Sequence, residues 1–278
     1  MKKLYFLRAL FLFVVFAAQN HVLGQAQLVP NETGLELPVQ LSTKKGQATA
    51  MFHVNYGNTI VGENGYQKKG RLLYITYNAE PFMVTNTIEL GEGACDDCVF
   101  AKKLSLGSSA AGIMDPSGQY YHVLAGATGK LAFDANGKKL KFAGGVFAFI
   151  LSQQDLEVVG GYWVALDPSY QPEKKSYLGK AMIIDGNTLF MTASGEDWQE
   201  RDGGAAYQSQ LVFDSQTGRY SAQNMQRIEP STLTLQKKQG FGADMVCLGD
   251  LDNDGFPDLA ISSSGFDGVN KDEGAVDI

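Results

Sequence analysis

The sequence contains few cysteines, histidines and prolines. Of its 278 residues, three are cysteine, three are histidine and eight are proline. Three cysteines cannot form the dense disulfide framework of a mini-protein, and a chain of this length does not need one. Basic residues are also scarce, since 23 lysines and arginines face 30 acidic residues, for a net charge of −7. This balance argues against a nucleic-acid partner, which requires a basic face.

Apolar segments long enough to span a membrane are missing as well. Residues 1–24 begin with Lys2, Lys3 and Arg8, and an apolar run from Ala9 to Ala18 follows. This pattern is typical of a secretory signal peptide. The run is shorter than the roughly 20 residues of a membrane anchor, which is the alternative interpretation. We therefore expect an exported protein that is secreted, extracellular or at the cell surface, or periplasmic in a bacterium.

The acidic residues are unevenly distributed. Removal of the predicted signal peptide takes away three basic residues and no acidic ones, which changes the net charge from −7 to −10. The last 38 residues, 241–278, carry nine acidic side chains and a single lysine, Lys271. This segment must either tolerate clustered carboxylates or use them.

No stretch of the chain sustains the apolar period of a helix. Short runs of four to eight residues, rich in β-branched and aromatic side chains, alternate instead with glycine-containing turns such as Asn136-Gly137 and Asp185-Gly186. Examples of these runs are 72–77 and 146–151, and a shorter one of three residues spans 182–184. The sequence therefore predicts an all-β fold.

A repeat is present within this pattern. Four apolar runs end in small-residue turns whose last glycines are Gly65, Gly129, Gly195 and Gly265, and each is followed by a glycine that opens another strand. A period of about 60–70 residues with about four strands is typical of one blade of a β-propeller, whereas unrelated hairpins of a β-sandwich are the alternative. The predicted four-stranded copies span residues 46–77, 108–151, 178–213 and 241–278.

The fourth copy resembles the FG-GAP repeat of integrin α-chain β-propellers. The resemblance rests on the opening Phe241-Gly242, the acidic turn at 250–254 and the strand entry Pro257-Asp258-Leu259. The Gly-Ala-Pro element of the family is replaced by Ser263-Ser264-Gly265, and the third copy, from Leu178-Gly179, is a weaker match. The resemblance implies an extracellular ligand-binding or adhesion platform with calcium in its hairpin loops.

The length of the chain is relevant to the number of propeller blades that it can form. A seven-bladed propeller of this kind needs about 450 residues, so four copies predict either part of a larger propeller or a four-copy variant with unusual closure. In the second case the N-terminal segment 25–45 could supply a closing strand from Leu35 to Leu41.

The acidic turn of the fourth copy has the spacing of a calcium loop. Its carboxylates occupy positions 1, 3, 5 and 9, a backbone carbonyl is available at position 7, and Gly255 permits the bend. Calcium prefers six to eight such oxygen ligands, and its binding would also offset the repulsion between the carboxylates. The predicted ligands are Asp250, Asp252, Asp254, Asp258 and the backbone carbonyl of Phe256.

Other interpretations of this loop are weaker. An EF-hand needs a glutamate at position 12, where Ile261 stands, and flanking helices where the sequence is strand-like. Magnesium is less suited because it prefers strict octahedral geometry, and an acidic turn without metal is the remaining alternative. Because the turns at Asp115 and Asp185 each hold a single carboxylate, the sequence predicts one strong site.

The cysteines favour a disulfide over a redox or zinc site. Cys95 and Cys98 form a Cys-x-x-Cys motif, but the two aspartates between them oppose thiolate formation and no second ligand pair exists for zinc. We predict a small-loop disulfide between them. Cys247 lies in an apolar run and is predicted to be a buried free thiol.

These features favour a non-enzymatic binding or adhesion module with an extracellular protein or glycan as its partner. A propeller-type hydrolase, or an accessory domain of one, is an alternative, but the sequence has no Gly-x-Ser-x-Gly elbow, and His53 and His122 lie in strand-like runs. A carbohydrate-binding propeller is a third hypothesis, in which Trp163 or Trp198 would contact a sugar.

Overall fold

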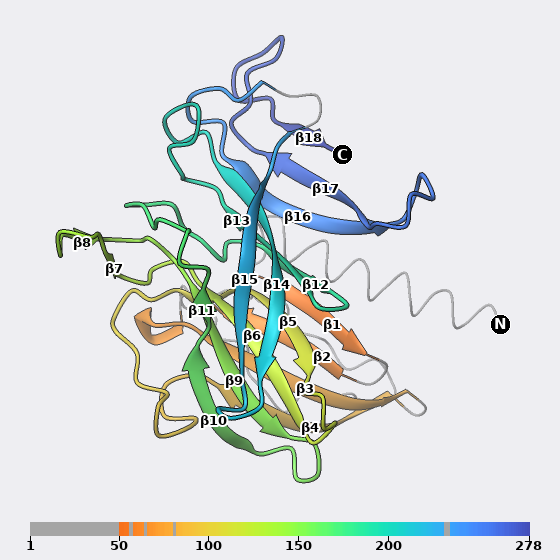
Figure 1. Ribbon diagram of the computed structural model, residues 1–278. Helices are drawn as coiled ribbons and strands as arrows, with labels where there is room; N and C mark the ends of the chain where they lie inside the picture. Colours follow the sequence, from red (N-terminus) through yellow and green to blue (C-terminus); the bar gives the residue numbers. More distant parts are fainter. Residues whose placement is uncertain (1–49, 56–57, 64–65, 80–81, 231–233) are drawn as a thin grey trace.

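The computed structural model describes residues 50–55, 58–63, 66–79, 82–230 and 234–278 (Figure 1). Within these ranges the chain forms eighteen β-strands and one short 3₁₀ helix, with no α-helix. The prediction of an all-β fold is confirmed. The predicted signal peptide at 1–24 and the segment 25–45 lie outside the described residues. Among the described residues, no helix has the length and apolar character needed to cross a bilayer.

The first sheet is an antiparallel meander in the order β1-β2-β3-β4. Side chains such as Ile60, Leu72 and Leu90 point into the core and are fully buried. A single 3₁₀ turn, η1 (Tyr66–Lys68), connects β2 to β3. The strands are β1 (Ala50–Asn55), β2 (Asn58–Glu63), β3 (Arg71–Ala79) and β4 (Phe82–Leu90).

The second sheet has the order β10-β9-β6-β5 and is also antiparallel. Strands β6 and β9 are buried along most of their length, as expected for the middle strands of a covered sheet. A small hairpin, β7 (Ala132–Phe133) and β8 (Lys139–Leu140), lies in the connection between them. The four strands are β5 (Leu106–Met114), β6 (Tyr120–Ala127), β9 (Val146–Ser152) and β10 (Val158–Trp163).

The third sheet has five strands in the order β11-β15-β14-β13-β12. Its pairs are antiparallel except for β11 with β15, where Ala165 pairs in parallel with Ser221. The long β14–β15 pair runs through the middle of the molecule in Figure 1. The strands are β11 (Ala165–Leu166), β12 (Met182–Asp185), β13 (Thr188–Ala193), β14 (Ala205–Asp214) and β15 (Arg219–Ile228).

The fourth sheet consists of three antiparallel strands, β16 (Phe241–Gly249), β17 (Asp258–Ser263) and β18 (Ala275–Asp277). It lies at the upper end of the molecule in Figure 1, beyond β13. The acidic loop predicted to hold calcium connects β16 to β17, so its two ends are fixed by neighbouring paired strands.

The four sheets are joined by the same backbone junction three times. At each junction a glycine just before an inner strand of one sheet pairs in parallel with a residue at or shortly before the start of a strand of the next sheet, namely β5, β12 or β16. This residue is always a fully buried leucine or phenylalanine. The bridged pairs are Gly70 with Leu106, Gly144 with Leu178, and Gly204 with Phe241.

The residue after each buried leucine or phenylalanine is a glycine that no other residue could replace without strain. Gly107, Gly179 and Gly242 have φ values of 83°, 83° and 85°. A Cβ atom at these positions would lie 2.6 to 2.9 Å from a carbonyl oxygen of the preceding sheet. The Leu-Gly or Phe-Gly pair therefore allows two backbones to approach closely at every junction.

Hydrophobic contacts also join each sheet to the next one along the chain. One buried cluster contains residues of the first and second sheets, another joins the second and third, and a third joins the third and fourth. One strand of each sheet also lies next to the corresponding strand of the following sheet, since β5 contacts β1 and β12, and β12 contacts β16. Each fully buried leucine or phenylalanine contributes about 1.5–3 kcal/mol, so these interfaces stabilise the sheets as one stack.

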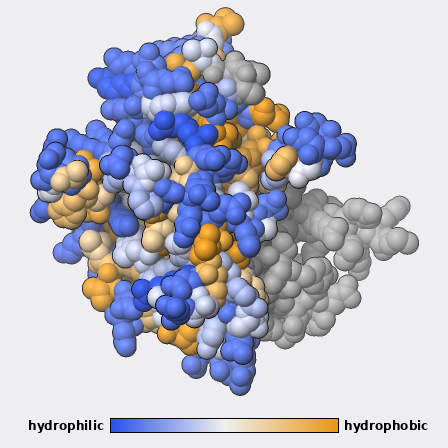
Figure 2. All heavy atoms as spheres, in the orientation of Figure 1, coloured by the Kyte–Doolittle hydropathy of each residue, from blue (hydrophilic) through white to orange (hydrophobic). Residues whose placement is uncertain are grey.

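The face of the molecule in Figure 2 is largely polar, and apolar residues form separate patches among hydrophilic ones on it. Single exposed apolar side chains are normal for soluble proteins. The most exposed of the large apolar side chains include Val99, Phe256 and Val269, and the last two lie in loops of the fourth sheet.

Candidate metal centre

The acidic loop between β16 and β17 is bent by residues with left-handed backbone conformations. Gly249, Asn253 and Gly255 have φ values of 77°, 61° and 90°. Glycine and asparagine tolerate this region better than other residues, and a Cβ atom at Gly249 or Gly255 would meet no atom within 4 Å, so the backbone conformation and not a lack of space favours glycine there. The chain can therefore reverse direction within a few residues and turn its aspartates toward one another.

Backbone amides of the loop hold these aspartates in place. Asp250 accepts hydrogen bonds from the backbone N–H groups of Asp254 and Gly255, both at 3.1 Å. Asp252 also accepts from Asp254 N–H at 3.1 Å, and Asp254 in turn accepts from Phe256 N–H at 2.8 Å. Such side-chain to backbone bonds are typical of Asx turns, and they orient the carboxylates before any ligand binds.

Three of the predicted ligands come together. Asp250, Asp252 and Asp254 each offer a carboxylate oxygen within 4.8 Å of the others, and all three side chains are exposed. Asp258 lies outside this group, half-buried at the start of β17, where its Oδ2 accepts a hydrogen bond from Leu251 N–H at 2.7 Å. Phe256 follows in the same loop, and its ring is exposed.

This donor set suits a hard divalent cation. The group offers only oxygen ligands, and calcium prefers carboxylate and carbonyl oxygens. Three like charges this close repel one another, so a cation among them would stabilise the loop as well as occupy it. Asp250, Asp252 and Asp254 would hold the ion, and exposure of the site leaves room for water or a further protein oxygen.

The other turns named in the sequence analysis have a different character. The Asp115 carboxylate is buried and accepts hydrogen bonds from Ser117, Gln119 and Tyr120, so the turn between β5 and β6 already satisfies it. These hydrogen bonds lower the pKa of Asp115 against the opposing effect of its burial. Asp185 is exposed at the tight turn between β12 and β13.

A groove of about 1010 Å³ begins where the acidic loop ends. Phe256, Pro257 and Asp258 line it from the fourth sheet, and Phe190 and Gln208 line it from the third. The loop that carries the aspartates therefore also forms one wall of this groove.

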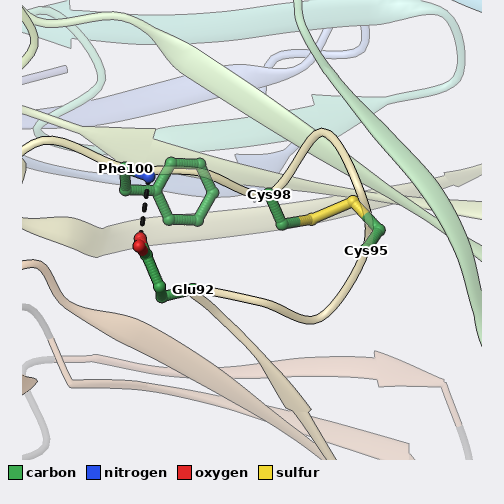
Figure 3. The surroundings of a disulfide bond; sticks show 4 residues. All are labelled: Glu92, Cys95, Cys98 and Phe100. Carbon is green, nitrogen blue, oxygen red and sulfur yellow. Dashed lines mark hydrogen bonds between the residues drawn. A yellow bond between two sulfur atoms is a disulfide. The ribbon is translucent and has the colours of Figure 1, made fainter.

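The structure joins Cys95 and Cys98 in a disulfide (Figure 3). Cys98 is fully buried, and the loop is fixed further by Glu92, which accepts a hydrogen bond from Phe100 N–H at 2.7 Å and pairs with Lys69 at 2.6 Å. The bond to Lys69 lowers the pKa of Glu92. The loop thereby holds the Phe100 ring against Phe147 of the second sheet.

Cys247 is a free thiol, but it is half-buried rather than buried as predicted. Strand β16 alternates between its two faces, and neighbouring Val246 and Leu248 are exposed. The apolar run around Cys247 therefore does not mark a fully covered strand.

His122, Trp163 and Trp198 pack against protein groups, whereas the side chain of His53 is not among those that the structure describes. His122 is buried, with its Nδ1 3.0 Å from the Tyr162 hydroxyl, and burial lowers its pKa to about 4. Lys130 lies over the ring of Trp163, and the Arg227 guanidinium lies over that of Trp198. One face of each tryptophan is thus covered and cannot stack on a sugar.

One polar cluster was not predicted from the sequence. Glu196 is buried beside Tyr207 and Arg227, although the three residues come from a loop and two different strands. The only sequence signal was an acidic residue three positions after the end of the apolar run of β13. Glu196 and Arg227 are 31 positions apart in the sequence, and no sequence motif links residues that meet only because strands pair in a sheet.

Comparison with known families matches residues 246–278 to the FG-GAP repeat. The predicted resemblance of the fourth copy is confirmed over these residues. No curated protein sequence matches the chain significantly. Among solved structures, a Thermus thermophilus protein provisionally described as an oxidoreductase (glucose dehydrogenase) is similar over 84% of this chain and 83% of its own, with 11% identity and a TM-score of 0.33.

Proposed function

Because residues 246–278 match the FG-GAP repeat, we propose that the protein is an exported, calcium-stabilised β-propeller that acts as a binding or adhesion module and not as an enzyme. The observation that carries the proposal is the group of Asp250, Asp252 and Asp254 in the hairpin loop of this repeat. The expected partner is an extracellular protein or a glycan.

The repeated junction supports the propeller part of the proposal. In a propeller, each blade packs on the next through its faces, and the first strands of the blades gather around one axis. The buried Leu-Gly or Phe-Gly pairs at the start of β5 and β16 and shortly before β12, together with the contacts of β5 with β1 and β12 and of β12 with β16, fit such an arrangement. Three interfaces with separate hydrophobic clusters fit blades that cannot bury both faces alone.

The disulfide supports an exported location. Disulfides such as Cys95–Cys98 persist in oxidising compartments and are rare in the reducing cytosol. A calcium site of modest enclosure, like the exposed aspartate group, also suits the high calcium concentration outside cells.

Calcium would act by fixing the loop. The aspartates would hold the ion, and the resulting rigid hairpin would keep Phe256, Pro257 and Asp258 in place at the wall of the groove. A partner that contacts this face would then meet an ordered surface and would not have to order the loop itself.

Thermal unfolding with and without calcium tests the proposal. At a calcium concentration a hundred times the dissociation constant, binding stabilises the folded state by about 2.7 kcal/mol, which corresponds to a rise in Tm of about 5 °C or more. Asp252→Asn should abolish most of this rise, whereas the matched change Asp155→Asn in an exposed turn of the second sheet should preserve it. A Tm that is the same in calcium and in chelator would contradict the proposal.

A further inference from the structure

A cavity of about 300 Å³ lies at one end of the third sheet, where β13 leads into its following loop. Its walls include Glu196 from this loop, Tyr207 from β14, Arg227 from β15, and Tyr170 and Glu173 from the segment before β12. Cavities of this volume accept small ligands or single side chains. It belongs to a different sheet from the acidic loop.

The most unusual group in the cavity is the Glu196 carboxylate. Only 2% of this residue is exposed, which is rare for glutamate. Its Oε1 accepts hydrogen bonds from the Tyr207 hydroxyl and from Nη2 of Arg227, and this nitrogen also lies 2.8 Å from the Tyr207 hydroxyl. Its Oε2 is buried and has no hydrogen-bond partner among the described residues.

A buried oxygen without a hydrogen-bond partner destabilises the folded state, and it does so more strongly when the group is charged. Burial accordingly raises the pKa of Glu196, while the bonds from Tyr207 and the charge of Arg227 lower it. The arrangement therefore leaves Oε2 of Glu196, and likewise the buried hydroxyl of Tyr170 in the same cavity, without a hydrogen-bond partner among the described residues.

The charges of the cavity favour a cationic donor. Glu173 and Glu196 contribute two carboxylates and Arg227 one guanidinium, so one further positive charge balances the cavity. The Arg227 charge is already paired with Oε1 of Glu196, and its guanidinium lies over the Trp198 ring, 4.5 Å from the centroid.

The aromatic walls favour the same ligand. The rings of Tyr170 and Tyr207 pack edge to face with their centroids 5.5 Å apart, and both residues line the cavity. A cation is attracted to the faces of such rings, and a charge-assisted hydrogen bond to a carboxylate is about twice as strong as a neutral one.

We propose that this cavity binds a primary ammonium group, which donates a hydrogen bond to Oε2 of Glu196 while Glu173 supplies the second negative charge. The ammonium group could belong to a free aliphatic amine or to a lysine side chain of a partner protein. The inference does not rest on calcium binding, and the melting experiment above can fail without affecting it.

Calorimetric titration of the full chain with three probes tests the proposal. Cadaverine represents a free amine, Nα-acetyl-lysine methylamide represents a protein side chain, and pentane-1,5-diol is a neutral molecule of the same length as cadaverine. At least one of the two amines should bind at least tenfold more tightly than the diol. The amine that binds more tightly identifies the source of the ligand.

Three variants locate the binding. Glu196→Gln should weaken amine binding at least tenfold, and Glu173→Gln, at a half-buried position that is safer for folding, should weaken it several-fold. Glu200→Gln is the matched control, because Glu200 is exposed in the same loop but does not line the cavity. It should bind amines as the parent does.

Three outcomes would overturn the proposal. If neither amine binds, a buried water satisfies Glu196 and the cavity is structural. If the diol binds as tightly as the amines, the cavity recognises hydroxyl groups and not a cation. If Glu173→Gln and Glu196→Gln bind the amines as tightly as the parent, the binding takes place elsewhere.

Discussion

At the residue scale, glycine positions decide where the sheets can meet. Gly242 combines a φ of 85° with an approach in which a Cβ atom would lie 2.8 Å from the Cβ of Thr192 and 2.9 Å from the Ala205 carbonyl oxygen. The sequence indicated this position through its Phe-Gly pair, because a buried aromatic followed by glycine at a strand start is a local signal. Gly107 follows a leucine, and β5 begins at Leu106, two residues before the predicted start of the second copy.

Gly242→Ala should lower the free energy of unfolding by at least about 2 kcal/mol, because it adds both an unfavourable φ and a clash with backbone. Gly160→Ala is the control, since a Cβ there would meet only Ile150 Cδ1, at 3.7 Å. It should be neutral or slightly stabilising, as expected for alanine in place of glycine within a strand. Urea unfolding measures both, and equal losses would contradict the role assigned to the junction.

A second residue-scale prediction concerns His122. Burial lowers its pKa to about 4, against a small opposing effect of Asp115, whereas the unfolded chain protonates this histidine near pH 6.5. Between these values the unfolded state binds more protons, so stability falls as the pH falls from 6.5 to 4. The expected contribution is about 3 kcal/mol.

Urea unfolding over this pH range checks the prediction when the parent is compared with His122→Gln, which keeps a polar group opposite Tyr162 but does not titrate. The variant should show a flatter profile, because the carboxylates titrate alike in both proteins. Parallel profiles would show that His122 does not contribute to the pH dependence.

At the element scale, alternating apolar runs and glycine turns predicted most of the strands, because a strand's period and its turns are local properties. The hairpin of β7 and β8 contains the turn Asn136-Gly137 that the sequence analysis named, although its strands are only two residues long. The cavity around Glu196 could not be predicted in this way. The β14–β15 hairpin that brings Tyr207 and Arg227 together is a local feature, but the approach of the loop after β13 and of the segment before β12 to this hairpin is not.

The disulfide loop gives an element-scale prediction. Closing a loop of four residues removes little entropy from the unfolded chain, and the loop-closure relation gives about 2 kcal/mol. Replacing both Cys95 and Cys98 by serine should therefore lower the free energy of unfolding by about this amount while the fold persists.

Urea unfolding of this double variant, with the reduced parent protein as a second reference, measures the effect. The free energies of unfolding of the double variant and of the reduced parent should agree if the loss of stability comes from the disulfide itself. A complete loss of folded protein in either sample would mean that the loop does more than restrain Phe100 against the second sheet.

At the scale of the whole molecule, sequential sheets contact mainly their neighbours, so a local ligand should affect the chain unevenly. The predicted calcium loop lies in the fourth sheet, which contacts the third sheet through β12, β13 and β14. The negative charge is concentrated in the same region, with nine acidic residues between 241 and 278.

Hydrogen exchange with and without calcium should show this unevenness. Calcium should slow exchange most at the amides of Leu251, Asp254 and Gly255, which donate to the loop carboxylates, and should leave β6 and β9 of the second sheet unchanged. Uniform protection over all sheets would instead indicate that the ion stabilises the molecule only as a single unit.

The surroundings of the two tryptophans affect the fluorescence of the protein. Each indole lies beneath a cation, Lys130 over Trp163 at 4.2 Å and Arg227 over Trp198 at 4.5 Å, and the two belong to different sheets. A nearby positive charge shifts the energy of the indole excited state, so the emission of each tryptophan depends on its own cation. With Trp163 replaced by phenylalanine, the remaining tryptophan emission comes from Trp198 alone, and its wavelength would report any movement of Arg227 when the Glu196 cavity fills.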